Sequence, residues 1–282
     1  MIKKSLCLIF VFIAAQVFCH AEINNIENVK HFLLEQNRLF RAGERVNYTE
    51  ISAGIAAIIE FGDSSAFPIL FDIVRIDYPE VIRFEAYGAM DFIQGDLFQF
   101  LFDMIKEGEP AEKLAAYRLA RNSKTLNISQ RGRLAELAME QSFVGFSLDV
   151  FYLVEMRYAA VLDLTSLRWT RANALAIRHY YLAKADFQNN LIPKQRFLEA
   201  ITLLGAVGNS DAALALGLQL GLINANTIRT GTFDAEITLA VIKALGYIGD
   251  SSVFHLLLDV SSLPYPENIQ AAAREAIERL RW

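Results

Sequence analysis

The triplet Gly62-Asp63-Ser64 is the first feature that suggests chemistry, because Gly-Asp-Ser also opens the nucleophile block of one class of esterases. A nucleophilic serine needs an activating base and, in that class, a preceding strand. No strand pattern precedes this triplet, and the same triplet recurs at Gly249-Asp250-Ser251. Because an active-site nucleophile is not expected twice, both copies are interpreted as capping turns between helices.

Metal chemistry finds little support in the sequence. Three histidines, His31, His179 and His255, lie beyond the N-terminal leader described below, and none has a second histidine or a carboxylate at ligand spacing. Nitrogen-rich metal sites need such spacing. The two cysteines, Cys7 and Cys19, both lie within the leader. The sequence therefore predicts no metal site, no disulfide and no cofactor.

Paired carboxylates are the remaining candidates for acid–base chemistry. Asp72 and Asp259 occupy equivalent positions of the two copies that surround the repeated triplet. A catalytic pair has to converge in one cleft, whereas equivalent positions in two repeats indicate a structural role. A carboxylate-dependent hydrolase or lyase is therefore kept as the alternative function.

Arginines and aromatic residues recur in the segment 167–187, which is predicted to be one helix. Arg168, Arg171 and Arg178 fall at spacings of three and seven residues, which places them on one stripe of that helix, with Trp169 and Tyr181 nearby. Arginine beside aromatic side chains is typical of interface hot spots and of anion recognition. These five residues are the predicted partner-binding candidates, for an acidic peptide or an anionic glycan or lipid headgroup. The alternative is a solvated outer face.

The stretch 143–158 is unusually aromatic and departs from the pattern of the rest of the chain. A buried irregular helix pair, a kink and an exposed docking patch all fit this composition. Burial is the preferred interpretation.

The first 21 residues have the layout of a secretory signal peptide. Lys3 and Lys4 precede an apolar run. A cleavage-site pattern with small residues follows this run and ends at Ala21. The run is shorter than the roughly 20 residues that span a bilayer. Cleavage after Ala21 would export residues 22–282 to the periplasm or cell envelope. Retention as an anchor and lipid attachment at Cys19 are the alternatives.

Charge is unevenly distributed along the chain. Residues 22–112 carry 7 Lys/Arg against 17 Asp/Glu, whereas residues 113–199 carry 13 against 7. Residues 200–282 carry 5 against 8. An acidic first third next to a basic middle indicates a polarised surface. Nucleic acid is disfavoured as a partner by the acidic total and the export signal.

Helical periodicity covers almost the whole chain. Apolar residues recur at three- and four-residue spacing, as in Ile51, Ile55 and Ile58, and proline occurs at helix starts. The pattern predicts an all-α fold of 13 to 14 helices with short connections, apart from a longer one near 224–232. The predicted helices are 24–41, 48–60, 64–76, 79–92, 96–107, 110–122, 128–141, 147–162, 167–187, 193–206, 210–223, 233–247, 251–261 and 266–281.

An internal repeat defines the architecture more closely. Residues 62–80 and 249–267 are identical at ten of nineteen positions without a gap, including Tyr78-Pro79-Glu80 and its copy at 265–267. Gly62 and Gly249 should end one helix, and Asp63 and Asp250 should cap the next. One helix pair cannot bury its apolar face alone, so stacking of pairs is expected.

This unit of an apolar helix, a Gly-Asp-Ser-Ser turn and a second helix resembles HEAT repeats, particularly the short variety of phycobilisome lyases. The resemblance is clear at 50–107 and 193–282 and weak in the middle segment 108–192. It implies an α-solenoid of antiparallel helix pairs, taken here as one domain over 22–282. It implies a binding surface without naming an activity.

The function expected from these observations is a non-enzymatic binding or scaffold protein of a bacterial periplasm or envelope. Its expected occupant is a protein partner, with no cofactor and no nucleic acid. A groove enzyme and an envelope carrier of a lipid or glycan are the alternatives. Two or more carboxylates in one pocket would favour the enzyme, and a deep apolar tunnel would favour the carrier.

Overall fold

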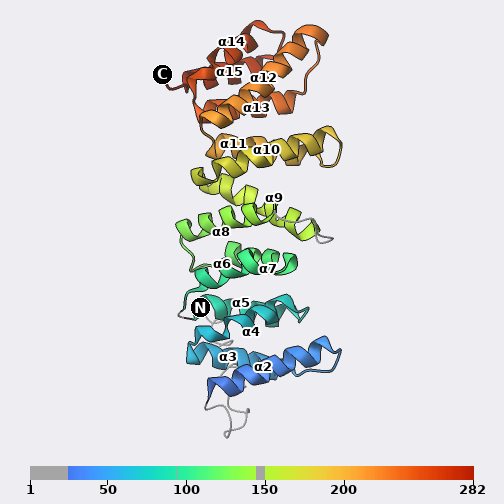
Figure 1. Ribbon diagram of the computed structural model, residues 1–282, viewed down its shortest axis with the longest axis vertical. Helices are drawn as coiled ribbons and strands as arrows, with labels where there is room; N and C mark the ends of the chain where they lie inside the picture. Colours follow the sequence, from blue (N-terminus) through green and yellow to red (C-terminus); the bar gives the residue numbers. More distant parts are fainter. Residues whose placement is uncertain (1–24, 94, 144–149) are drawn as a thin grey trace, which may run out of the picture. The chain divides into compact units, whose positions relative to one another are not determined.

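The computed structural model describes residues 25–93, 95–143 and 150–282, and over these ranges the chain forms 14 α-helices (Figure 1). The predicted all-α fold is confirmed, and contacts join successive helices as expected for a stacked helical array. The predicted signal peptide, 1–21, lies outside the described residues. None of the described helices is long and apolar enough to cross a membrane.

The chain divides within α8, after Arg131, into two compact units. The first contains α2 (Ile26–Arg41), α3 (Tyr48–Phe61), α4 (Phe67–Arg75), α5 (Glu80–Phe92), α6 (Leu97–Glu107), α7 (Pro110–Asn122) and the start of α8 (Ile128–Gln141). The second contains the rest of α8, α9 (Val150–Leu167), α10 (Asn173–Gln188), α11 (Lys194–Val207), α12 (Ser210–Thr230), α13 (Ala235–Ile248), α14 (Phe254–Ser262) and α15 (Glu267–Glu278).

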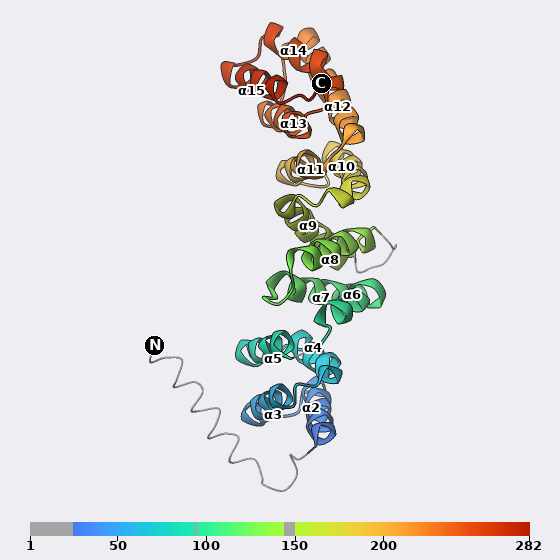
Figure 2. The same cartoon turned by 90° about the vertical axis from the view of Figure 1, so that its left-hand side faces the viewer.

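The first unit is built from the pairs α2–α3, α4–α5 and α6–α7. Helix α3 also packs on α5, and α2 packs on α4, so α2 and α4 form one layer and α3 and α5 the other (Figure 2). Buried apolar side chains such as Leu33, Ile58 and Leu70 fill the space between the layers. Burial of one apolar stripe per helix is what holds such pairs together.

The second unit repeats this arrangement with α11, α13 and α15 in one row and α10, α12 and α14 against it. Close helix approach in this row depends on small residues. A Cβ on Gly205 would lie 2.8 Å from Ala244 Cα, and one on Gly246 would lie 2.9 Å from Ala276 Cα. No side chain larger than hydrogen fits between these helices without displacing one of them.

Both copies of the repeat adopt the turn that the sequence predicts. Gly62 ends α3 with φ 65°, and Gly249 ends α13 with φ 70°, both in the left-handed region. The carboxylates of Asp63 and Asp250 each accept a hydrogen bond at 2.9 Å from the backbone N–H two residues later. A short 3-10 turn then leads into α4 or α14.

The predicted end of the helix at residue 223 is wrong, because α12 continues to Thr230 and ends at Gly231 in the left-handed conformation. Asn224 and Thr227 look like loop residues in sequence, yet both are buried. Both side chains hydrogen-bond the hydroxyl of Tyr265, at 2.9 Å and 3.0 Å. Tertiary partners therefore keep polar residues in the helix, and the longer loop expected at 224–232 does not form.

The predicted helix boundary at residues 162–167 is also wrong. Helix α9 runs to Leu167, and α10 begins only at Asn173, after a turn through Arg168 in the left-handed region with φ 49°. Trp169 anchors this turn, because its indole N–H donates to Glu136 at 2.8 Å. The aromatic stretch 143–158 is divided. Residues 144–149 lie outside the described ranges, Phe151 is exposed, and Met156 and Tyr158 are buried.

Candidate functional site

A groove of about 600 Å³ lies between α3 and α5 in the first unit. Volumes of this size accommodate a small molecule or the side chains of one helical segment. Its walls are mostly apolar, and its lining residues are Tyr48, Thr49, Ser52, Ala53, Ile55, Ala56, Ile59, Pro79, Val81, Ile82, Phe84, Glu85, Gly88 and Ala89.

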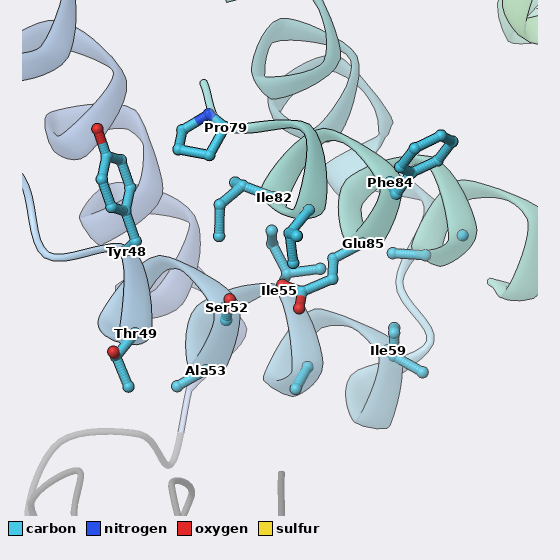
Figure 3. Close-up of a pocket in the computed structure, with 14 residues that line it drawn as sticks. Tyr48, Thr49, Ser52, Ala53, Ile55, Ile59, Pro79, Ile82, Phe84 and Glu85 are labelled. Atoms are coloured by element: carbon cyan, nitrogen blue, oxygen red, sulfur yellow. The ribbon is translucent and has the colours of Figure 1, made fainter. Parts of the chain in front are cut away.

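The two walls come from facing sides of the two helices (Figure 3). Ser52, Ile55 and Ile59 project from α3 toward α5, and Ile82 projects from α5 toward α3. Large apolar side chains remain open to solvent along α5, where Val81 and Phe84 are each 65% exposed. Exposed apolar residues that flank an apolar groove are typical of binding surfaces.

Glu85 is the one charged residue among those that line the groove. Its carboxylate points from α5 toward Ser52 and Ile55 on α3 (Figure 3). The Oε2 atom is buried and has no hydrogen-bond partner. A buried oxygen without a partner costs free energy, so this atom would gain from a hydrogen bond that the groove residues do not supply.

The two copies of the repeat differ at one position where the helices approach each other. Residue 59 in the first copy corresponds to residue 246 in the second, at the same separation of 187 residues as Gly62 and Gly249. Gly246 lets α13 touch α15 at Ala276. Ile59 and the corresponding Ala89 both line the groove. The same pair of positions thus forms a close helix contact in one copy and lines a groove in the other.

An aromatic cluster stands at the Tyr48 end of the groove. The Tyr48 ring meets the Tyr78 ring edge to face at 6.3 Å, and the Phe40 ring lies 4.2 Å from the Tyr78 ring. The Tyr78 hydroxyl donates to buried Asn37 at 3.1 Å. Burial raises the pKa of Tyr78 to about 12, so this donor keeps its proton at neutral pH.

The buried Tyr–Asn pair is a second shared feature of the two copies, and the sequence analysis did not find it. Tyr78 with Asn37 corresponds to Tyr265 with Asn224, and both pairs are 41 residues apart. The two asparagines are separated by the same 187 residues as the two turns. Extending the gapless alignment N-terminal to residue 62 would have revealed it.

The predicted partner-binding residues do not form one stripe. Arg168, Trp169 and Arg171 lie in the turn before α10, and the Arg171 guanidinium is 3.7 Å from the Glu136 carboxylate. Arg178 lies within α10, with its guanidinium 4.4 Å from the centre of the Phe143 ring. The predicted single helix over 167–187 is therefore corrected, and its arginines separate into two groups.

Exposure distinguishes these predicted residues further. The side chains of Arg168, Arg171 and Arg178 are exposed, and Tyr181 is 50% exposed. Trp169 is partly buried, because its ring packs against Gly132 on α8. All except Trp169 are therefore accessible to a partner.

The repeat-turn residues have structural partners. Hydrogen bonds from Ser65 lower the pKa of Asp63, and those from Ser210 and Ser252 lower the pKa of Asp250. Asp72 accepts hydrogen bonds from Asn37 and Arg41, whereas Asp259 is exposed. Over the described residues, no three His, Cys, Asp or Glu side chains are placed to hold a metal ion.

The groove residues were not among the sequence-based candidates, although the repeat contained a signal. Phe84 and Glu85 correspond to Ala271 and Ala272 in the second copy. The residues that make the turn are the same in both copies, whereas these two differ in size and charge.

Comparison with known proteins returned no matches: no protein-family model matches the chain, and no curated protein matches it. What is shown is the architecture of an all-helical protein whose helices pack in sequential pairs.

Proposed function

We propose that this chain is a HEAT-like, non-enzymatic binding protein whose α3–α5 groove holds an apolar helical segment of a protein partner that carries one cationic side chain. The observation that carries the proposal is the buried, unpartnered Oε2 of Glu85 within an otherwise apolar groove. The predicted place of action is the bacterial periplasm or envelope.

The shape of the groove supports a helical occupant. The groove runs between the neighbouring helices α3 and α5. Exposed Val81 and Phe84 lie one turn apart along α5. An amphipathic helix that docks into such a groove buries its apolar anchors at spacings of three and four residues. Burying both side chains against a partner would contribute a few kcal/mol, at roughly 25 cal/mol per Å².

Charge supports a cationic group on the partner. Residues 22–112 carry ten more acidic than basic side chains. A lysine or arginine from the partner would supply the hydrogen bond that Glu85 lacks and would neutralise its carboxylate in a water-poor setting. Charge complementarity of this kind also accelerates association at low salt.

The groove chemistry favours binding over catalysis. General acid–base hydrolysis uses two groups that converge on one bond, and a single carboxylate stands among the residues that line the groove. The basic group at Arg168 and Arg171 remains a second predicted contact region, for an acidic partner. Arg171 already lies beside Glu136, which weakens it as the principal site.

A helical-peptide display library panned against the purified chain tests the proposal. The expected result is enrichment of peptides with Leu, Ile or Phe at helical spacing and one Lys or Arg. Glu85→Lys should weaken the binding of the enriched peptides about tenfold or more, because it places the new lysine next to the cationic side chain of the peptide. Peptides selected on Glu85→Lys should carry Asp or Glu instead.

Gly88→Leu provides a blocking variant. Gly88 lies on the exposed side of α5 at the groove, and a Cβ there meets nothing within 4 Å. The variant should therefore fold, with unchanged circular dichroism, and should no longer bind the enriched peptides. Ser261→Leu, at an exposed position of α14 in the second unit, is the control and should retain them. Peptides that bind Gly88→Leu as well as wild type would place the binding site elsewhere and refute the proposal.

A further inference from the structure

Three arginines gather around two aromatic rings in the second unit. The Arg157 guanidinium lies 5.4 Å from the centre of the Phe143 ring and 5.8 Å from that of the Tyr158 ring. Arg178 approaches the same Phe143 ring at 4.4 Å, and Arg196 approaches Tyr158 at 4.2 Å. Helices α9, α10 and α11 each contribute one of these arginines.

Arg157 is the exceptional member of this group, because it is only 8% exposed. Its Nε atom is buried without a hydrogen-bond partner, and no carboxylate of the described residues forms an ion pair with it. Burial of a charged guanidinium without a partner costs several kcal/mol. Contact with aromatic faces at these distances offsets only part of that cost.

The carboxylates nearby do not balance the positive charge. Glu199 is engaged by Arg196 at 2.8 Å. Asp186 attracts Arg157 electrostatically without reaching ion-pair distance. Among the described residues, Arg196 is the one arginine of the three that forms an ion pair with a carboxylate, and buried Arg157 has none.

His179 adds an independent observation. It is 1% exposed, both of its ring nitrogens are buried without hydrogen-bond partners, and its ring meets Tyr158 edge to face at 5.5 Å. A neutral imidazole carries one N–H donor. An unsatisfied donor and an unpaired guanidinium thus belong to the same cluster around Tyr158.

We infer that this cluster is a binding site for an oxyanion, a carboxylate or a phosphate group, held by Arg157 with Arg178 and Arg196 around it. Guanidinium groups match the geometry of both oxyanions and bind them through paired hydrogen bonds. The site is separate from the α3–α5 groove, because all of its residues belong to the second unit.

The test measures thermal stability and calorimetric binding of the full chain with inorganic phosphate and, separately, with acetate, in chloride buffer at matched ionic strength. Phosphate or acetate should raise the Tm of the wild type along a saturable curve, and the stronger of the two identifies the group. Arg157→Met should be at least as stable as wild type in chloride alone, because it removes an unpaired buried charge. It should show no saturable response to either anion.

Two further variants keep the result interpretable. Arg178→Gln changes an exposed side chain, so it should fold and bind the anion at least tenfold more weakly than wild type. Arg229→Gln, an exposed arginine on α12 outside the cluster, should bind like wild type. The inference is overturned if neither anion gives a saturable response with wild type, or if Arg178→Gln and Arg229→Gln respond alike.

Discussion

At the scale of single residues, several polar groups in the core have roles that their types alone do not reveal. Asn37 and Asn224 are buried and hold the hydroxyl groups of Tyr78 and Tyr265. His179 is equally buried but has no hydrogen-bond partner. Paired groups stabilise the fold, whereas an unpaired buried group costs free energy and therefore indicates a ligand or a pH dependence.

His179 should make stability depend on pH. Burial, with the positive charges of Arg157 and Arg196, lowers the pKa of His179 from 6.5 to about 3. The unfolded chain therefore binds this proton at a higher pH than the folded chain does. The stability associated with neutral His179 is fully present above pH 6.5. It is lost as pH falls toward 3, at up to about 1.4 kcal/mol per pH unit.

Urea unfolding in chloride buffers between pH 7 and 4 measures this effect. His179→Leu should be less sensitive to acid than wild type, whereas His255→Leu, at an exposed histidine, should follow wild type. Equal acid sensitivity of His179→Leu and wild type would show that this imidazole is not held neutral by burial.

At the scale of elements, the repeated turn uses the same backbone in two surroundings. Gly62 and Gly249 both adopt the left-handed conformation. A Cβ at Gly62 would meet nothing within 4 Å, whereas one at Gly249 would lie 2.9 Å from the Arg279 carbonyl oxygen. Comparing alanine substitutions at the two positions therefore distinguishes the cost of backbone strain from the cost of a steric clash.

Gly62→Ala should destabilise the chain by about 1 to 2 kcal/mol, the cost of an alanine in the left-handed region. Gly249→Ala should cost more, because the clash with Arg279 adds to the same strain. Urea unfolding followed by circular dichroism measures both. Equal losses in the two variants would contradict the added clash.

At the scale of the whole molecule, two compact units contain corresponding copies of one Tyr–Asn pair. Tyr78→Phe or Tyr265→Phe removes the hydroxyl donor and leaves a buried asparagine oxygen without it, which should cost about 1 to 3 kcal/mol. The two sites share no hydrogen-bond partner, so the double variant should lose the sum of both costs.

Thermal and urea unfolding of both single variants and the double variant measure this additivity. Tyr247→Phe is the control, because Tyr247 is 61% exposed and should change stability little. A double variant that loses much less than the sum would show that the two pairs are coupled.

Most of the fold follows from local sequence signals. The number of helices, most of their ends and the repeated turn were predictable, because three- and four-residue periodicity and Gly-Asp capping act within a few residues. The ends of α9 and α12 were not. Trp169 is held by Glu136, 33 residues away, and Asn224 by Tyr265, 41 residues away. Such distant partners override the local propensity of a loop-like or helix-like segment.

What the sequence determined by itself is the class of architecture and the repeat that builds it. What only the tertiary structure decided is which copy of that repeat has a groove between its helices. Ile59 and Gly246 are ordinary helix residues in sequence, yet one lines a groove between two helices and the other lets two helices touch. Likewise, the arginines predicted as one stripe separate, and Arg178 joins Arg157 and Arg196 from two other helices. Both outcomes depend on contacts between helices, which periodicity along a single helix does not encode.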